Sequence, residues 1–286
     1  MLGRITVGLF FFLLVWGNLV AGLKAGLGCP DWPLCHGKIL PPFRWDIYME
    51  FTHRVIGAVA GLFLVALSWR RFKVYKGGAR AVPVLAVGLL ATEVVLGGVV
   101  VLLEIPAQLT TVHFMMGLAV FLLAYYMMTF DGVSRPPVFS AKGYGALFLG
   151  MTVLVFALAA LGAYVRHSGA GLAISRWPLS NSGLFPAALT GPVLIQFSHR
   201  VVAALVFLTV AALYAAAVRD ERLAFHRKSA RDLFLMIVAQ VLVGGVVILS
   251  GLSFLATGLH LAVALGMLMI LVAMWSREIE AKGAAS

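Results

Sequence analysis

Long apolar stretches dominate this sequence and restrict the folds that it can adopt. They lie near residues 5–26, 46–68, 81–103, 108–130, 143–165, 191–217, 232–250 and 254–275. Each is close to the roughly 20 residues that an α-helix needs to cross a bilayer. Backbone N–H and C=O groups find no water inside a bilayer, so each stretch must satisfy them internally as a helix. With 62% hydrophobic and 12% charged residues, the chain is predicted to be an all-α integral membrane protein with eight transmembrane helices.

The net charge of +11 could suggest nucleic-acid binding, but the distribution of the charge argues against it. Most of the 22 Lys and Arg residues fall in segments that share one side of the membrane when the N-terminus is inside. This is the positive-inside pattern, in which basic loops set topology. We therefore expect a multi-pass protein with both termini in the cytoplasm and no nucleic-acid partner.

The sequence repeats itself. EFTHRVIGA, which begins at Glu50, matches QFSHRVVAA, which begins at Gln196. EVVLGGVVVL from Glu93 matches QVLVGGVVIL from Gln240, and the segment DWPLC from Asp31 matches a later RWPLS. The match divides the chain into residues 1–139 and 140–286. An even number of helices in each half makes both halves enter the bilayer in the same direction. The prediction is two tandem four-helix bundles related by a pseudo-twofold axis along the membrane normal.

Four histidines fall at repeated positions: His199 follows His53 by 146 positions, and His260 follows His113 by 147. At 1.5 Å per residue, all four are expected about 10 Å below the outer surface. A titratable ring inside a bilayer needs a reason, and paired rings at equal depth suit bis-histidine ligation of one haem per half. A simple polar contact between helices would explain one such histidine, but four at repeated positions favour haem.

Two further sequence features bear on the histidines. Gly57 and Gly117 each follow a histidine by four residues, where a missing side chain could admit a flat macrocycle. His36, His167 and His226 fall in loops or at helix ends, and we expect them to be solvated, although His36 could line an outer site.

The two halves differ where chemistry would matter. Glu50 lies three residues before His53 on the same helix face, whereas its counterpart Gln196 cannot ionise. A carboxylate near a haem edge can accept a proton, so Glu50 is the candidate catalytic residue and the first half is the candidate reactive half. An ordinary ion pair between Glu50 and Arg54 is the alternative. Arg54 and Arg200 could instead reach haem propionates.

Cys29 and Cys35 are the only cysteines in the chain, and both lie in the first outer loop. A pair in an oxidising compartment predicts a disulfide. The bond could brace the loop or exchange with the thiols of a redox partner. The corresponding loop of the second half contains neither cysteine.

Taken together, EFTHR, TVHF, QFSHR, GLH and the GCPDWPLC loop resemble the haem A synthase family of cytochrome oxidase assembly. The resemblance implies an oxidoreductase that converts haem O to haem A by oxidising a ring methyl to a formyl group. It implies substrate haem O near His53, His113 and Glu50. It also implies a bound haem b whose iron is ligated by His199 and His260. Some members carry a second cysteine pair in the second half, where this chain has Ser180.

The resemblance also implies partners and a setting. We expect a functional link to haem O synthase, an electron donor that the sequence does not identify, formation of homo-oligomers, and a prokaryotic plasma membrane with the haem sites towards its outer side. Two other classes compete. A diheme b-type cytochrome that takes electrons from quinol would use the same histidines but usually places its haems at different depths. A transporter built from repeats would need a broken helix or an acidic pathway.

Overall fold

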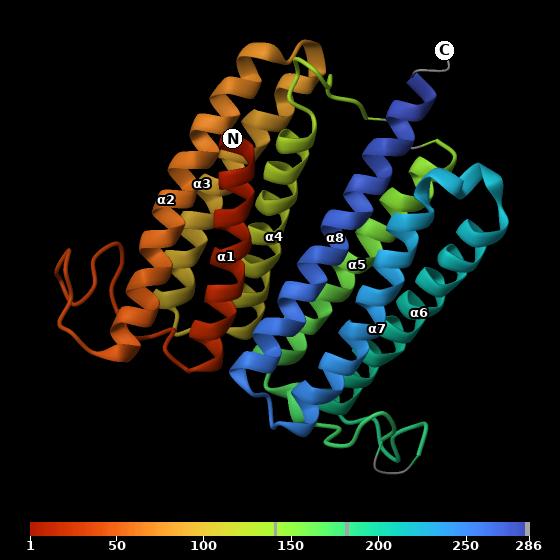
Figure 1. Cartoon of the computed structure of the whole chain (residues 1–286). Helices are drawn as coiled ribbons and strands as arrows, with labels where there is room; N and C mark the ends of the chain where they lie inside the picture. Colours follow the sequence, from red (N-terminus) through yellow and green to blue (C-terminus); the bar gives the residue numbers. More distant parts are fainter. Residues whose placement is uncertain (140–141, 181–182, 284–286) are drawn as a thin grey trace. The chain divides into compact units, whose positions relative to one another are not determined.

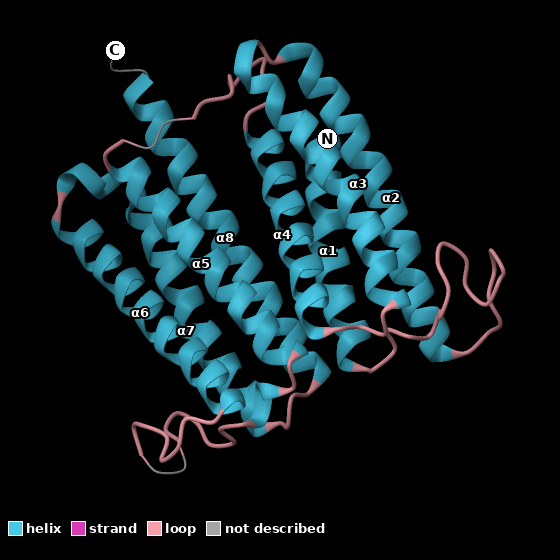
Figure 2. Cartoon of the chain, turned by 180° about the vertical axis from the view of Figure 1, so that it is seen from behind, coloured by secondary structure: helices cyan, strands magenta, loops and turns pink. Residues whose placement is uncertain are grey.

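The computed structural model describes residues 1–139, 142–180 and 183–283, and over these ranges the chain folds into helices and connecting loops (Figures 1 and 2). Eight helices in this described part are long and apolar enough to cross a membrane, as predicted. They are α1 (Leu2–Gly22), α2 (Trp45–Val74), α3 (Ala81–Leu102), α4 (Ala107–Thr129), α5 (Tyr144–His167), α6 (Gly191–Arg219), α7 (Arg227–Leu249) and α8 (Phe254–Gly283). Short 3₁₀ turns η1 (Gly77–Arg80), η2 (Ala170–Leu172) and η3 (Glu221–His226) join some of them.

The helices form two compact units, Met1–Val138 and Phe139–Ser286. In the first unit, α1 and α3 each pack against both α2 and α4, which closes a ring of four helices. In the second unit, α5 and α7 each pack against both α6 and α8 in the same order. Each unit is therefore a four-helix bundle, and the boundary between them falls within one residue of the division expected from the repeat.

Several helices extend beyond the apolar stretches that predicted them. The α2 helix continues to Val74 through Arg71 and Lys73, which lie in its last turn. Lys and Arg are strong helix formers, and a positive charge near a helix C-terminus is favourable for the helix dipole. Hydropathy therefore finds the part of a helix that can lie in lipid, and the polar turn beyond it remains helical for a different reason.

The long loops that follow α1 and α5 share two backbone features at aligned positions. In both, the bond between the aligned tryptophan and proline is cis, and a short antiparallel bridge follows it. The cis bonds are Trp32–Pro33 and Trp177–Pro178, and the bridges join Cys35 to Lys38 and Ser180 to Gly183.

A tryptophan holds each loop against the third helix of its own bundle. A Cβ atom added to Gly98 of α3 would lie 2.8 Å from the Trp32 ring, and one added to Gly245 of α7 would lie 2.8 Å from the Trp177 ring. Side-chain atoms do not normally approach so closely, so only glycine leaves room for the indole. Each loop is thereby held at the end of its bundle where the first and second helices meet it (Figure 1).

We expect Gly98→Ala to displace Trp32 and destabilise the first unit by about 1–3 kcal/mol, the usual cost of an extra methyl group in a packed site. Thermal unfolding of the detergent-solubilised protein measures this. Gly88→Ala is the matched control, because Gly88 lies in the same helix with no atom within 4 Å of its added Cβ. The control should unfold at the same or a higher temperature, since alanine favours helix. Equal unfolding temperatures for the two variants would contradict this packing.

Candidate functional site

The four repeated histidines lie on the second and fourth helices of each bundle. They are His53 on α2, His113 on α4, His199 on α6 and His260 on α8. All four side chains are partly buried, and each has a buried Nδ1 atom for which the described residues provide no hydrogen-bond partner. An unsatisfied buried polar atom costs about 1–3 kcal/mol. Repeating that cost four times at matched positions is difficult to explain by folding alone.

The two histidines of each bundle lie close to one another. His53 and His113 are near enough to interact electrostatically, and so are His199 and His260. In the first unit, α2 and α4 also contact each other across the bundle. The structure therefore brings together, within each unit, the two rings that the sequence analysis paired.

A glycine lies against the edge of each imidazole ring, and sequence reasoning did not find these positions. We call them the glycine seats: Gly17 beneath His53, Gly97 beneath His113, Gly162 beneath His199 and Gly244 beneath His260. An added Cβ would lie 2.8, 3.1, 2.9 and 3.2 Å, respectively, from the Cε1 atom of the ring. In every case the seat belongs to the helix that precedes the histidine's own helix. The seats fix the position of each ring by close packing.

The donor set of each pair of rings fits the ligand chemistry of a haem iron. Neutral imidazole nitrogen is a standard axial ligand for haem iron, and each bundle brings two such rings together. The two glycines at i+4 have different surroundings. A Cβ at Gly57 would meet Leu13 only at 3.8 Å, whereas one at Gly117 would lie 2.9 Å from Glu93 Oε1. Gly117 therefore makes room for a carboxylate.

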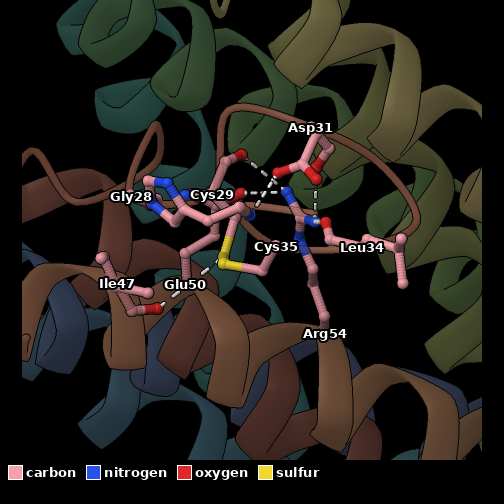
Figure 3. Close-up of polar contacts among 9 residues, drawn as sticks. Gly28, Cys29, Asp31, Leu34, Cys35, Ile47, Glu50 and Arg54 are labelled. Carbon is pink, nitrogen blue, oxygen red and sulfur yellow. Dashed lines mark hydrogen bonds and ion pairs between the residues drawn. A yellow bond between two sulfur atoms is a disulfide. The ribbon is translucent and has the colours of Figure 1, made fainter. Parts of the chain in front are cut away.

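Glu50 is almost fully buried, with 4% of its surface exposed, and it connects α2 to the first loop (Figure 3). Its Oε2 accepts a hydrogen bond of 2.8 Å from the backbone N–H of Cys29, and its Oε1 lies 2.6 Å from the Arg54 guanidinium. Arg54 also donates to the backbone carbonyls of Cys29, Asp31 and Leu34. The ion pair that was the alternative for Glu50 is thus present, and it is part of a loop anchor.

Gln196 anchors the second loop in the same way without a charge. Its Oε1 accepts from the backbone N–H of Ile174, and its Nε2 donates to the carbonyl of Gly171 at 2.7 Å. Arg200 donates to the carbonyls of Ile174 and Arg176, both at 2.9 Å. An amide therefore suffices in the second loop, where it both accepts and donates, whereas both oxygens of Glu50 accept in the first loop. Propionate binding by Arg54 and Arg200 stays a prediction beside these observed contacts.

The predicted disulfide is confirmed: Cys29 and Cys35 are bonded, with their Cα atoms 4.7 Å apart. Both cysteines are buried against Ile47. In the second loop their positions are taken by Ile174 and Ser180, and the Ser180 hydroxyl donates to the carbonyls of Gly183 and Phe185. The second loop is therefore closed at this point by hydrogen bonds instead of a covalent bond.

Asp31 organises the turn that leads out of the disulfide. Its carboxylate accepts backbone N–H groups from His36 at 2.6 Å and Gly37 at 2.7 Å, and both of these residues have positive φ. These donors, Gly37 foremost, hold the pKa of Asp31 below its usual value. The His36 ring lies 2.9 Å from the Gly28 carbonyl, so His36 helps to close the loop.

Sequence reasoning placed one histidine wrongly. His226 was expected to be solvated, but it is 1% exposed and its Nε2 lies 3.1 Å from Glu278 Oε2. The rings of Phe148 and Phe225 pack against it. The partner carboxylate comes from α8, 52 residues away along the chain, so no local pattern around His226 could reveal the burial.

We expect Asp31→Asn to loosen the first loop and to expose its buried disulfide. Because folding lowers the Asp31 pKa, the contacts are complete above about pH 4, the ordinary Asp range. They are lost as the pH falls through the lowered value. Phosphine reduction of Cys29–Cys35 should be several-fold faster in the variant at pH 7, and the difference should shrink in strong acid.

The matched control for this test is Asp131→Asn. Asp131 also accepts backbone N–H groups in a loop of the first unit, from Val133, Ser134 and Arg135. It does not belong to the disulfide loop, so its replacement should leave the reduction rate unchanged. Identical rates for wild type and Asp31→Asn at pH 7 would show that Asp31 does not hold the loop closed.

Comparison with known proteins agrees with this arrangement. Residues 2–272 match the family described as cytochrome oxidase assembly protein, COX15-CtaA. The chain is 35% identical over 268 residues to a heme A synthase of Symbiobacterium thermophilum, covering 88% of this chain and 86% of the relative. Heme A synthases of Exiguobacterium sp. and Staphylococcus aureus are 30% and 27% identical, over 90% and 91% of this chain and 85% and 88% of theirs. Matches of this extent show that the chain belongs to the cytochrome oxidase assembly family COX15-CtaA.

Proposed function

We propose that this chain is a haem A synthase, an oxidoreductase that converts haem O to haem A by oxidising a ring methyl to a formyl group. The observation that carries the proposal is the pair of seated imidazoles in each bundle, each with a buried Nδ1 that has no hydrogen bond to the described residues. The full-length similarity to proteins named heme A synthase supports the same reaction. It favours this function over a quinol-oxidising diheme cytochrome.

The two bundles are assigned different roles. His199 and His260 would hold haem b in the second unit, and His53 and His113 would hold substrate haem O in the first. When bound, haem b supplies reversible one-electron transfer. The seats Gly162 and Gly244 orient the second pair of rings, and Gly17 and Gly97 orient the first.

Glu50 is the catalytic residue in this proposal. Oxidation of a methyl to a formyl group releases protons and electrons and adds an oxygen atom, so the site needs a proton acceptor. The carboxylate of Glu50 lies three residues from His53 and is held in position by the Cys29 N–H and by Arg54. The second unit has an amide at this position, which cannot accept a proton. This difference supports placing the chemistry in the first unit.

The wider setting follows from the same proposal. The protein would reside in a prokaryotic plasma membrane with both termini in the cytoplasm and its haem sites towards the outer side. Haem O synthase would supply the substrate, and a separate redox protein would serve as electron donor. Assembly into homo-oligomers remains part of the proposal, and the exposed apolar helix surfaces are compatible with either lipid or a second copy.

Glu50→Gln tests the catalytic role with the size of the side chain preserved. Both Glu50 oxygens accept hydrogen bonds, so the new amide NH₂ group faces a donor, and we expect a modestly lower unfolding temperature with an unchanged haem b content. Haem A formed in cells that also express haem O synthase should fall at least about 100-fold, the lower range for loss of an acid–base group. Extracted haem, separated by chromatography, gives the measurement.

Gln196→Glu makes the reciprocal change in the second unit. It brings a carboxylate oxygen against the carbonyl of Gly171, so its unfolding temperature should also fall, but haem A formation should fall far less than in Glu50→Gln. Glu50→Ala removes both the charge and the anchor and should also lower the unfolding temperature. Full haem A formation by Glu50→Gln would remove Glu50 from the mechanism.

The glycine seat at Gly162 provides a second test. In Gly162→Ala the added methyl would lie 2.9 Å from His199 Cε1, so the ring must shift and haem b should be held roughly tenfold more weakly, the smaller effect of disturbing a ligand's support. The ratio of haem b to purified protein measures this. Gly150→Ala, in the same helix with no atom near its added Cβ, should retain the wild-type ratio. If Gly162→Ala also retained the wild-type ratio, the packing of His199 against Gly162 would not contribute to haem b binding.

A further inference from the structure

Glu93 is a carboxylate inside a membrane-spanning helix, and nothing in the proposed mechanism uses it. Its side chain is 15% exposed, and its Oε1 lies 3.1 Å from Nδ1 of His113. Its Oε2 is buried and has no hydrogen-bond partner among the described residues. An ionisable group in such a place is costly and usually functional, and the group that it faces is the proposed ligand of the substrate iron.

The first bundle is shaped to accept this carboxylate. A Cβ at position 117 would lie 2.9 Å from Glu93 Oε1, so Gly117 is what allows the approach. In the sequence repeat, Gln240 corresponds to Glu93 and Ala264 corresponds to Gly117. Both lie 147 positions later, the same offset as between His113 and His260. The charge and the room for it therefore occur together in the first unit, and both are replaced in the second.

The second bundle presents a neutral environment to its histidine. His260 lies near the backbone carbonyl of Gln240, and the Gln240 side-chain oxygen has no partner in the described part of the chain. His113 and His260, on the fourth helix of each bundle, thus each lie against a glycine seat but differ in the charge of their surroundings. Only His113 faces an acidic side chain.

We propose that Glu93 is a positioning residue for His113, accepting a hydrogen bond from Nδ1–H so that Nε2 binds the iron of substrate haem O. The inference rests on the proposed function, since it takes His113 as a ligand. The 3.1 Å separation suits the bond, although the N–H does not point at Oε1 in the structure. Such contacts commonly align only when the ligand is bound.

The physical consequence is a difference in electron donation between the two sites. A carboxylate that accepts the second N–H of a ligating histidine fixes its tautomer and raises its basicity as a ligand. The more strongly donating imidazole favours the ferric state, so the first-unit iron should have the lower reduction potential.

Glu93→Gln tests the inference in the full-length protein, purified with haem b and loaded anaerobically with haem O from co-expressed haem O synthase. Optical redox titration reports the potential of each haem. We expect the first unit's affinity for ferric haem, relative to its affinity for ferrous haem, to fall about tenfold. This raises the reduction potential of that haem by about 59 mV for one electron. The potential of the haem b should not move. An unchanged first-unit potential would overturn the inference.

Two further variants keep the result decisive if Glu93→Gln retains haem O poorly. Gly117→Ala keeps the charge but pushes Oε1 away, and it should raise the first-unit potential. The double variant Gln240→Glu, Ala264→Gly should lower the potential of haem b. If neither potential moves, the inference is wrong.

The failure of this inference can be distinguished from that of the proposed function. A wild-type protein that binds no haem in the first unit, or that forms no haem A, overturns the function and this inference with it. A wild-type protein that binds both haems and forms haem A, beside variants with unaltered potentials, overturns only the role of Glu93.

Discussion

The burial of four imidazole rings in two apolar helical bundles is the constraint on which the rest of the structure depends. Each ring lies against a glycine of the preceding helix, close enough that any added side chain would displace it, and each leaves a buried nitrogen without a partner in the described chain. A bundle selected for stability alone would place leucine at such positions, because unpaired polar atoms are costly in a low-dielectric interior. The fold accepts this cost at matched sites, which is what a ligand-binding scaffold requires.

The internal repeat separates what maintains the fold from what performs chemistry. Both units share cis tryptophan–proline bonds, tryptophans packed on glycine and arginine contacts to loop carbonyls. These shared features hold a loop against a bundle. Features present in one unit alone require another explanation. The Cys29–Cys35 bond is replaced by hydrogen bonds of Ser180, so closing the loop does not in itself demand a disulfide.

Sequence patterns predicted the helices, the pairing of the histidines and the disulfide, because each follows from a period or a spacing along one segment. The glycine seats were missed although the GG dipeptides at positions 97–98 and 244–245 were visible in the repeat. Which glycine faces a histidine and which faces a tryptophan depends on the rotation of α3 and α7 about their axes, and packing against other helices sets that rotation. The burial of His226 against Glu278 was missed for the same kind of reason, since the two come from distant segments.

The two amide replacements between the units point in the same direction. Glu50 corresponds to Gln196, and Glu93 corresponds to Gln240, so both carboxylates beside the first pair of histidines become neutral beside the second. The second unit holds its loop with the amide of Gln196 and has alanine where Gly117 makes room for Glu93, so a bundle of this kind folds without either charge. Negative charge beside the first site alone stabilises an iron that has lost an electron and any positive charge that develops on its ligand. The same pair of substitutions leaves the second site without a carboxylate, and such a site lets a haem hold an electron more readily.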